Sequence, residues 1–402
     1  MKVIFFICLL TILYTYIGYG LVLFILVQIK RFFYGKESIE GFQDSELPDV
    51  TFVVAAYNEE DWIDGKIKNC LDFDYPKEKI EFLFVTDGSS DNTPNRVEDY
   101  VYPAGVKWSL YHSPERRGKI AAVERIMEFV NTPITIYTDA NTMVNKMAIR
   151  KIVAHYKNPK VGAVAGEKRV SMEEIDSANS AGEGFYWKYE SKLKKWDSEL
   201  YSVVGAAGEL FSLRTNLYQA VPKDTVIEDF YMTLKIAMQG YKVKYESGAF
   251  AVESASASVG EELKRKIRIS AGGLQAIARL LPLLNIFKYG ILSFQYISHR
   301  MLRWTLTPLA LAILFFVNIP LALSGNPFFV FTMLGQIGFY ALALVGYILE
   351  KRKLKFKMFF IPYYFCVMNY SVYVGFFRFI KGSQSVVWEK AKRLEKEETV
   401  SK

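Results

Sequence analysis

The chain has 402 residues, of which 51% are hydrophobic and 15% aromatic, and its formal net charge is +8. This length allows one large domain or two ordinary ones, and the charge suits an anionic partner such as a phosphate, a nucleotide or a lipid headgroup. Three scattered cysteines and three histidines give no zinc spacing or disulfide framework, and they argue against a histidine-built metal site or triad.

Four long apolar runs predict contact with a membrane. Residues 3–29 carry no charge, and this run exceeds both the ~20 residues of a membrane span and the ~7–15 residues of a signal-peptide core. Residues 304–324 and 328–349 are joined by a short "GNP" turn, and residues 358–377 follow the basic loop "EKRKLKFK". We predict a retained N-terminal membrane helix and a C-terminal membrane region.

Residues 47–260 have the pattern of a soluble α/β domain. Short apolar runs such as "TFVVAAY", "EFLFVTD", "PITIYTDA" and "VGAVAG" alternate with helical patterns such as "KIAAVERIMEFV". This alternation predicts βαβ units and a mostly parallel sheet. Ligands of such sheets lie beyond the carboxyl ends of the strands, so the polar residues that end these runs are expected to share one crevice.

The strand-end residues are Tyr57, Asn58, Glu59, Asp87 and Asp139. Asp and Asn also favour turns and helix caps. We interpret Asp91 as a cap of that kind, and Asn58 remains open between a cap and a site residue.

Six segments in order carry a resemblance: "VVAAYNEE", "VTDGSSDNT", "RRGKIAAV", "YTDANT", "GAAGELFSLR" and "EDFYMTLKIAMQGYKVKYE". Together they resemble the family-2 glycosyltransferases, inverting enzymes that use nucleotide sugars. The resemblance covers roughly residues 47–270 and is greatest with membrane-embedded synthases of cellulose, hyaluronan and poly-N-acetylglucosamine. It implies an α/β GT-A catalytic domain, nucleotide-sugar-binding and Rossmann-like, inserted between transmembrane and interfacial α-helices.

Four regions are therefore expected: a transmembrane helix at 1–30, a cytosolic GT-A domain at 47–260, amphipathic interface helices at 261–300, and a transmembrane region with a basic tail at 301–402. Basic residues after the first run and before the last one mark the cytoplasmic side. They place the catalytic domain in the cytosol, where nucleotide sugars are available. The protein is therefore expected to be an integral protein of the cell (inner) membrane. A full last span would leave the basic tail outside, so we interpret the last run as re-entrant or interfacial.

The resemblance implies donor contacts. Tyr57, Glu59 and Asp87 would hold the uridine end of a UDP-sugar, although Thr86 replaces the first acidic residue of the family's usual pair. Lys119 would face the diphosphate, with a solvated surface lysine as the alternative. The basic residues after the domain could also meet the diphosphate. The predicted donor set is Tyr57, Glu59, Asp87, Lys119, Asp139, Arg265 and Arg268, with Lys266 beside the last two.

The segment "TDAN" places Asp139 and Asn141 where the family usually has Asp-x-Asp. An asparagine oxygen can bind a cation but adds no charge, whereas the donor's diphosphate brings charges of its own. With so few His and Cys residues, oxygen ligands favour a hard cation, Mg²⁺ or Mn²⁺. We interpret the pair as a working metal site that is weak without donor.

Asp229 falls where the family carries its general base, and Glu228 is expected to support it. An inverting transfer needs a carboxylate within hydrogen-bond reach of the acceptor hydroxyl. Acidic residues also favour the first turn of a helix, and both roles can hold together.

The family's Gln-x-x-Arg-Trp motif, whose Trp helps to hold the acceptor, corresponds here to "KRKIRISAGGLQ", with Ile269 in place of the Trp. The segment "HRMLRW" fits the pattern better, but it opens an apolar run, where Arg and Trp are ordinary interface anchors. We therefore assign the acceptor to Trp187 or Trp196, with core packing as an equal alternative. The three histidines receive no role.

The sequence thus predicts a membrane-bound inverting glycosyltransferase that extends a glycan. Alternatives are a single-transfer enzyme acting on a membrane lipid, and a transporter or channel with a nucleotide-binding domain, which the near absence of intramembrane charge disfavours. The expected partners are a nucleotide-sugar donor, a glycan or lipid-linked acceptor, membrane lipids and, in the family, accessory export proteins. Nucleic acid is disfavoured because basic residues cluster at the membrane flanks.

Overall fold

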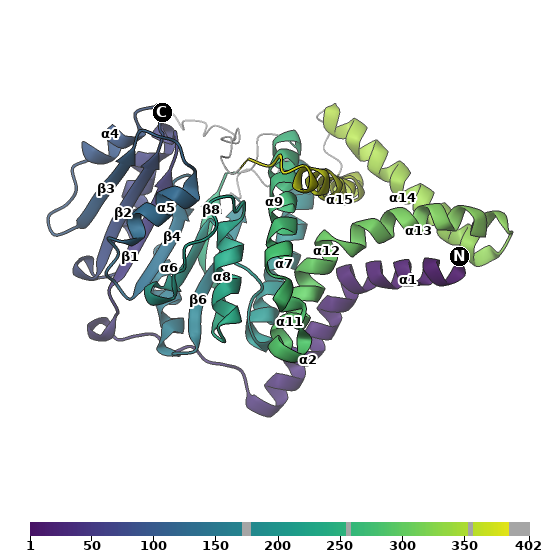
Figure 1. Cartoon of the computed structure of the whole chain (residues 1–402), viewed down its shortest axis with the longest axis horizontal. Coiled ribbons are helices and arrows are strands. Elements are labelled where there is room, and N and C mark those ends of the chain that lie inside the picture. The colour runs from purple at the N-terminus through teal and green to yellow at the C-terminus, as the bar shows by residue number, and fades with distance from the viewer. Residues whose placement is uncertain (171–177, 255–258, 353–356, 386–402) are drawn as a thin grey trace, which may run out of the picture.

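A computed structural model describes residues 1–170, 178–254, 259–352 and 357–385. Figure 1 shows a twisted sheet with helices on both faces at one end and long apolar helices at the other. The strands are β1 Val50–Ala56, β2 Ile80–Asp87, β3 Lys107–Ser113, β4 Ile134–Asp139, β5 Thr142–Val144, β6 Val161–Val170, β7 Leu210–Arg214 and β8 Lys242–Glu253. The helices of this end are α3 Glu60–Leu71, α4 Thr93–Glu98, α5 Lys119–Met127, α6 Ala148–Ala154, α7 Ala178–Leu200 and α8 Glu228–Met238.

The eight strands form one mixed sheet in the order β3-β2-β1-β4-β7-β6-β8-β5. The first four pair in parallel, as predicted. The prediction of a mostly parallel sheet is wrong at β7, which runs antiparallel to both β4 and β6. Leu210 at the start of β7 pairs with Thr138 at the end of β4, so the loop before β7 enters the sheet at the carboxyl edge of the parallel strands.

Side chains of the central strands alternate between two cores, as a pleated strand requires. Phe52 and Val54 of β1 pack in one core with residues of α3 and α6. Val53 packs in the other core with residues of α5 and α8. Because both faces are covered, the strands read as nearly continuous apolar runs. The open carboxyl edge is left for polar groups.

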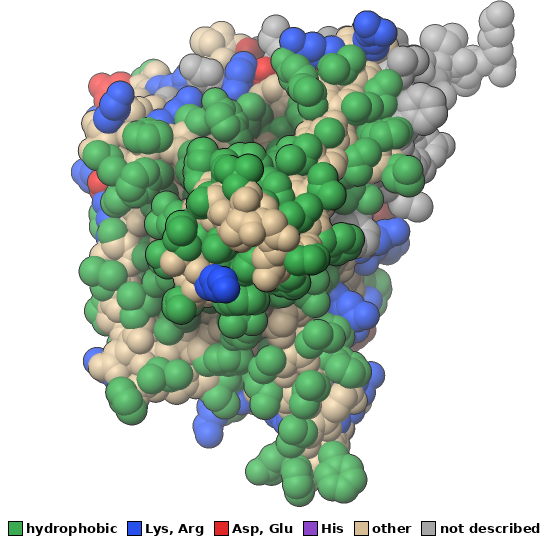
Figure 2. Space-filling model, turned by 90° about the vertical axis from the view of Figure 1, so that its right-hand side faces the viewer, with side chains coloured by type: hydrophobic (Ala, Val, Ile, Leu, Met, Phe, Trp, Pro, Cys, Tyr) green, Lys and Arg blue, Asp and Glu red, His purple; other side chains and the backbone are tan. Residues whose placement is uncertain are grey.

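The two ends of the chain supply the apolar helices. The first helix continues from α1 (Lys2–Leu13) through a π-helical turn (Tyr14–Gly18) into α2 (Tyr19–Tyr34). Among the described residues, three helices are long and apolar enough to cross a membrane: Lys2–Tyr34, α13 (Leu306–Leu323) and α14 (Pro327–Lys351). Figure 2 shows the end of the molecule that carries them, covered largely by hydrophobic side chains.

Helix α15 (Lys357–Ile380) is not one of those three candidates in the described part of the chain. Figure 1 views α15 nearly along its axis, whereas α13 and α14 run across the picture, so α15 crosses their direction. It packs closely on α9 (Val259–Arg279): a Cβ added at Gly375 would lie 2.7 Å from the Cβ of Ser270. The interfacial interpretation of this segment remains a prediction, and the basic tail beyond residue 385 lies outside the described residues.

The region predicted as interface helices, residues 261–300, contains most of α9, then α10 (Ile286–Tyr289), α11 (Ile291–Tyr296) and most of a π-helical turn (Ile297–Met301). The short helix α12 (Leu302–Trp304) follows it and leads into α13. Phe287 of α10 is 99% exposed, which is costly in water and suits a lipid boundary. One face of α9 is instead buried against the domain and α15, so only part of this region is a surface element.

Candidate active site

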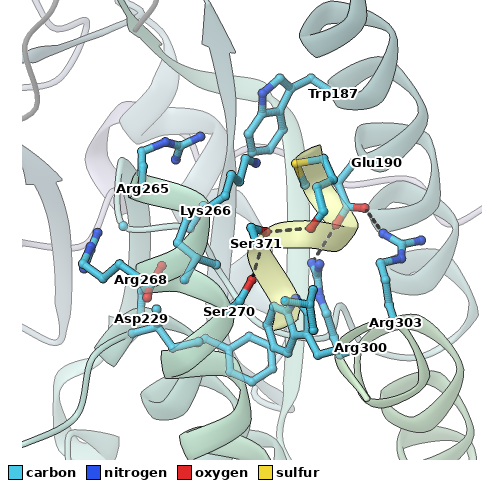
Figure 3. Close-up of a pocket in the computed structure, with 18 of the residues that line it drawn as sticks. Trp187, Glu190, Asp229, Arg265, Lys266, Arg268, Ser270, Arg300, Arg303 and Ser371 are labelled. Atoms are coloured by element: carbon cyan, nitrogen blue, oxygen red, sulfur yellow. Dashed lines mark hydrogen bonds and ion pairs between the residues drawn. The ribbon is translucent and has the colours of Figure 1, made fainter. Parts of the chain in front are cut away.

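A cavity of about 590 Å³ joins the sheet domain to the apolar helices. At the sheet end it is lined by Lys119, Asp139 and Asp229. At the other end it is lined by Tyr16 of the first helix and by one face of α15. Figure 3 shows charged side chains from α7, α8, α9 and the 297–304 segment converging on it. One space therefore touches both the strand edge and the apolar helices.

Asp229 and Glu228 are the first two residues of α8, and both line the cavity. Burial, helped by the charge of Glu228 and opposed by that of Lys119, raises the pKa of Asp229 to about 7. A carboxylate with a pKa near neutral is suited to accept a proton at physiological pH. The first turn of the helix holds this carboxylate in a fixed direction.

Lys119 is the first residue of α5, and its side chain is 15% exposed. Its ammonium Nζ lies 2.6 Å from Asp139 Oδ1 and 3.2 Å from a carboxylate oxygen of Glu228. Burial alone would lower the pKa of Lys119, but these carboxylates raise it well above its usual value. The residue is thus a recessed cation of the cavity rather than a solvated surface lysine.

The residues of the candidate metal site fit a cation bound mainly by oxygen. Asp139 ends β4 and lines the cavity, and the Oδ1 atom of the buried Asn141 has no hydrogen-bond partner among the residues that the structure describes. No cluster of three or more His, Cys, Asp or Glu side chains suited to a metal occurs in the described ranges. A cation bound by these two side-chain oxygens would therefore need further ligands, which a nucleotide diphosphate can provide.

Lys66 is a buried cation behind this turn that sequence reasoning missed. Its side chain is fully buried, and its ammonium donates to Thr138 Oγ1 (3.1 Å) and to the carbonyl oxygen of Thr142 (2.7 Å). Burial, opposed by the charges of Cys70 and Asp139, lowers the pKa of Lys66 to about 8. Lys66 thus ties together the two threonines that flank the "DAN" turn.

The predicted donor residues of the first two strands lie at the same edge but outside the lining of the cavity. Asp87 accepts hydrogen bonds from the backbone N–H groups of Arg117 (2.8 Å) and Gly118 (2.6 Å). It therefore fixes the loop that leads into Lys119. Gly88 has φ +66°, and a Cβ there would lie 2.4 Å from Arg116 Cβ, so only glycine allows this approach.

The ring of Tyr57 lies 3.6 Å from the guanidinium carbon of Arg116, which offers a flat surface beside the strand ends. Glu59 is buried, and its backbone N–H donates to Thr93 Oγ1 (2.8 Å). Thr86, which replaces an acidic residue of the family, is fully buried and bonded to His112 Nδ1 (2.8 Å). The Thr86 side chain therefore serves the packing of β2 against β3.

Asp91 and Asn58 connect the loops that follow β1 and β2. Asp91 accepts hydrogen bonds from the N–H groups of Thr93 and Glu60, the first residues of α4 and α3, as expected for a cap. Asn58 has φ +51°, and its Oδ1 accepts from the N–H of Ser90 at 2.8 Å. This left-handed conformation suits Asn better than most residues.

The basic residues of α9 line the cavity, and their predicted contact with the diphosphate remains a prediction. Arg265 and Lys266 both pair with Glu262, at 2.9 and 3.4 Å. Arg268 donates to the carbonyl oxygen of Val226 (3.3 Å), and Figure 3 shows its side chain beside Asp229. These cations face the side of the cavity that holds the base.

The segment "HRMLRW" was interpreted as an interface anchor, and the structure shows that this is wrong. Arg300, Arg303 and Trp304 line the cavity. The carboxylate of Glu190 on α7 contacts Arg300 (2.7 Å) and Arg303 (2.9 Å). The Trp304 ring packs edge-on at 5.3 Å from Phe230, the neighbour of the candidate base. The arginines turn inward because Glu190 satisfies their charges.

The two candidate acceptor tryptophans separate. Trp187 lines the cavity, with Lys266 Nζ 5.1 Å from its ring. Trp196 lies against Phe24 of the first helix, with ring centroids 5.3 Å apart. Trp196 therefore packs the helices together, whereas Trp187 and Trp304 both line the cavity.

Comparison with known proteins identifies the family of the sheet domain. Residues 51–221 match the model of the family described as glycosyl transferase family 2. The chain carries a family 2 glycosyltransferase domain. The family expected from the motifs is thereby confirmed for this domain, and so is the GT-A fold.

Two curated relatives are synthases of a polysaccharide. The chain is 28% identical over 241 residues to the poly-beta-1,6-N-acetyl-D-glucosamine synthase of Staphylococcus aureus (strain MSSA476), a match covering 58% of this chain and 57% of that protein. It is 23% identical over 259 residues to the synthase of the same name from Staphylococcus epidermidis, covering 62% and 61%. The chain thus spans less than two thirds of the length of either relative.

A solved structure extends the likeness beyond the domain. A mannosyltransferase from Pyrobaculum calidifontis, in complex with GDP-Man and Mn²⁺, has a TM-score of 0.69 and 22% identity. The match covers 94% of this chain and 99% of that one. At this identity the likeness concerns the fold, and it includes the helices that flank the domain.

The raised pKa of Asp229 predicts how activity depends on pH. A base must be deprotonated, so we expect kcat/KM to be high above about pH 7 and to fall about tenfold per pH unit below it. Glu228→Gln should move the inflection to lower pH, because it removes a like charge that raises the pKa of Asp229. A profile that is flat from pH 5.5 to 8 in both proteins would contradict the assignment.

Proposed function

We propose that this glycosyltransferase moves a sugar, with inversion, from a nucleotide-diphosphate sugar to a growing glycan at a membrane surface. The observation that carries the proposal is the position of Asp229, a carboxylate with a pKa of about 7 on the wall of a cavity that runs from the strand edge to the apolar helices. A donor bound at the strand edge and an acceptor from the apolar end would meet there.

The chain's own residues would perform the transfer in a simple sequence. Lys119 and Arg268 attract the diphosphate, and Asp139 with Asn141 would hold Mg²⁺ or Mn²⁺, which supplies positive charge to the leaving group when bound. Asp229 accepts the proton of the acceptor hydroxyl as that oxygen attacks the anomeric carbon. The bond from that carbon to the diphosphate breaks on the opposite face, which inverts the configuration.

The topology is part of the proposal. The helix Lys2–Tyr34 with α13 and α14 would span the cell membrane, with the sheet domain on the cytosolic side, where nucleotide sugars occur. The four regions proposed are those expected from the sequence, at residues 1–30, 47–260, 261–300 and 301–402. Helix α15 would lie across the inner ends of the spans.

A panel of donors tests this function. Purified protein in detergent is supplied with labelled UDP-glucose, UDP-N-acetylglucosamine and GDP-mannose, and the products are sized. We expect transfer from a UDP-sugar into products of several residues, because Tyr57, Glu59 and Asp87 resemble the family's uridine site. Use of GDP-mannose alone would contradict the uridine assignment, and products one sugar longer would favour single transfer.

Two variants should separate chemistry from binding. Asp229→Asn keeps size and helix-start geometry but removes basicity, so turnover should fall by ~10²–10⁴ with donor affinity changed only a few fold. Asp139→Asn should instead weaken donor binding, because it removes the charged metal ligand. Single-turnover rates and donor titration distinguish them. Near-normal turnover in Asp229→Asn would transfer the role of base to Glu228.

Trp304 and Trp196 form a matched pair for the acceptor side. Trp304→Ala removes an aromatic surface beside the base, so we expect shorter products and a higher KM for an added oligosaccharide acceptor. Trp196→Ala removes a ring of similar size that packs on Phe24, so it should lower thermal stability and leave product length unchanged. Equal product lengths in both variants would remove Trp304 from the acceptor site.

A further inference from the structure

We propose that Lys119 is an internal cation that occupies the metal position of the donor-free enzyme, so that a divalent ion enters only together with the nucleotide. The inference rests on the proposed function for the place of the metal, and it adds the order in which metal and donor bind.

The first observation is geometric. The Lys119 ammonium bridges Asp139 (2.6 Å) and Glu228 (3.2 Å), as a bound cation would. A Cβ built at Gly208 would lie 3.2 Å from the same nitrogen, so the opposite wall has little room for a second cation. Lys119 thus fills the space in front of Asp139.

The second observation is the charge behind the turn. Asp139 is the one carboxylate of the "DAN" segment, since Asn141 is neutral. The fully buried Lys66 attracts Asp139 from behind, while Lys119 pairs with it in front. A divalent ion at Asp139 would therefore meet the Lys119 ammonium 2.6 Å from that carboxylate, and the repulsion between the two cations is substantial at such short range.

The third observation concerns how Lys119 would change partner. Asp87 holds the backbone just before Lys119 in place, because it accepts hydrogen bonds from the N–H groups of Arg117 and Gly118. The four-carbon side chain of Lys119 itself is flexible. A nucleotide diphosphate brings at least two negative charges, so the Lys119 ammonium can form an ion pair with a phosphate oxygen instead of Asp139. Asp139 is then left free to bind the metal together with that diphosphate.

The test measures metal binding without turnover. Mn²⁺ is titrated into the full-length detergent-solubilised protein and followed by the loss of the free-ion EPR signal, with and without UDP or GDP. We expect weak binding by the wild type that tightens with nucleotide. Lys119→Met should bind Mn²⁺ without nucleotide at least about fivefold more tightly than the wild type, and further substitution of Asp139 by Asn should abolish that gain.

Two controls define the cause. Lys119→Arg keeps the charge and should bind Mn²⁺ as weakly as the wild type, whereas the exposed Lys160→Met loses one charge elsewhere and should change nothing. Tight nucleotide-independent binding by the wild type would overturn the inference without any variant, and so would an unchanged affinity in Lys119→Met. A protein that binds Mn²⁺ in the expected order but transfers no sugar would contradict the proposed function alone.

Discussion

The buried carboxylate of Glu190 is the contact on which the shared cavity depends. It lies on α7 of the sheet domain and pairs with Arg300 and Arg303 of the segment that leads into α13. His299 of that segment also contacts Glu190 and bonds Asp197, which accepts a hydrogen bond from Tyr19 of the first helix. Breaking one partner of such a network leaves an uncompensated buried charge, at a cost of about 3–5 kcal/mol. The domain and its apolar helices are therefore held in one arrangement.

The strand-edge part of the site was predictable because its geometry follows from local pattern. Parallel strands bring their carboxyl ends to one edge, so Asp87 and Asp139 had to lie at the same edge of the sheet, with β1 between their strands. The inward position of Arg303 was not predictable, because its partner Glu190 lies 113 residues earlier in the chain. Arg and Trp beside an apolar run look the same in sequence whether they face lipid headgroups or a buried acid. Lys66 was missed for a similar reason, since a lysine on an amphipathic helix usually lies in water.

The replacement of the family's second acidic residue by Asn141 has a physical counterpart in Lys66. Lys66 donates to Thr138 Oγ1 and to the carbonyl oxygen of Thr142, on either side of the turn, so this segment already lies beside a buried positive charge. With Asn141, the turn keeps a buried oxygen without a hydrogen-bond partner in the described part of the chain. The negative charge that a bound metal would need beyond that of Asp139 would then come from the diphosphate of the donor. The substitution and the buried lysine are therefore consistent with each other.

The far end of the cavity bears on the kind of acceptor. The α15 face that lines it carries Asn369 and Ser371 as well as aromatic and aliphatic side chains. Asn369 Oδ1 accepts a hydrogen bond from Tyr16 (2.9 Å), so polar groups persist between the helices. Ser371 Oγ likewise donates to the carbonyl oxygen of Met368 (2.6 Å), so both polar groups already have partners within the protein. A sugar chain offers both hydroxyl groups and apolar ring faces, and it can use the aromatic rings and the polar groups at once. This mixture of groups is compatible with the glycan acceptor proposed above.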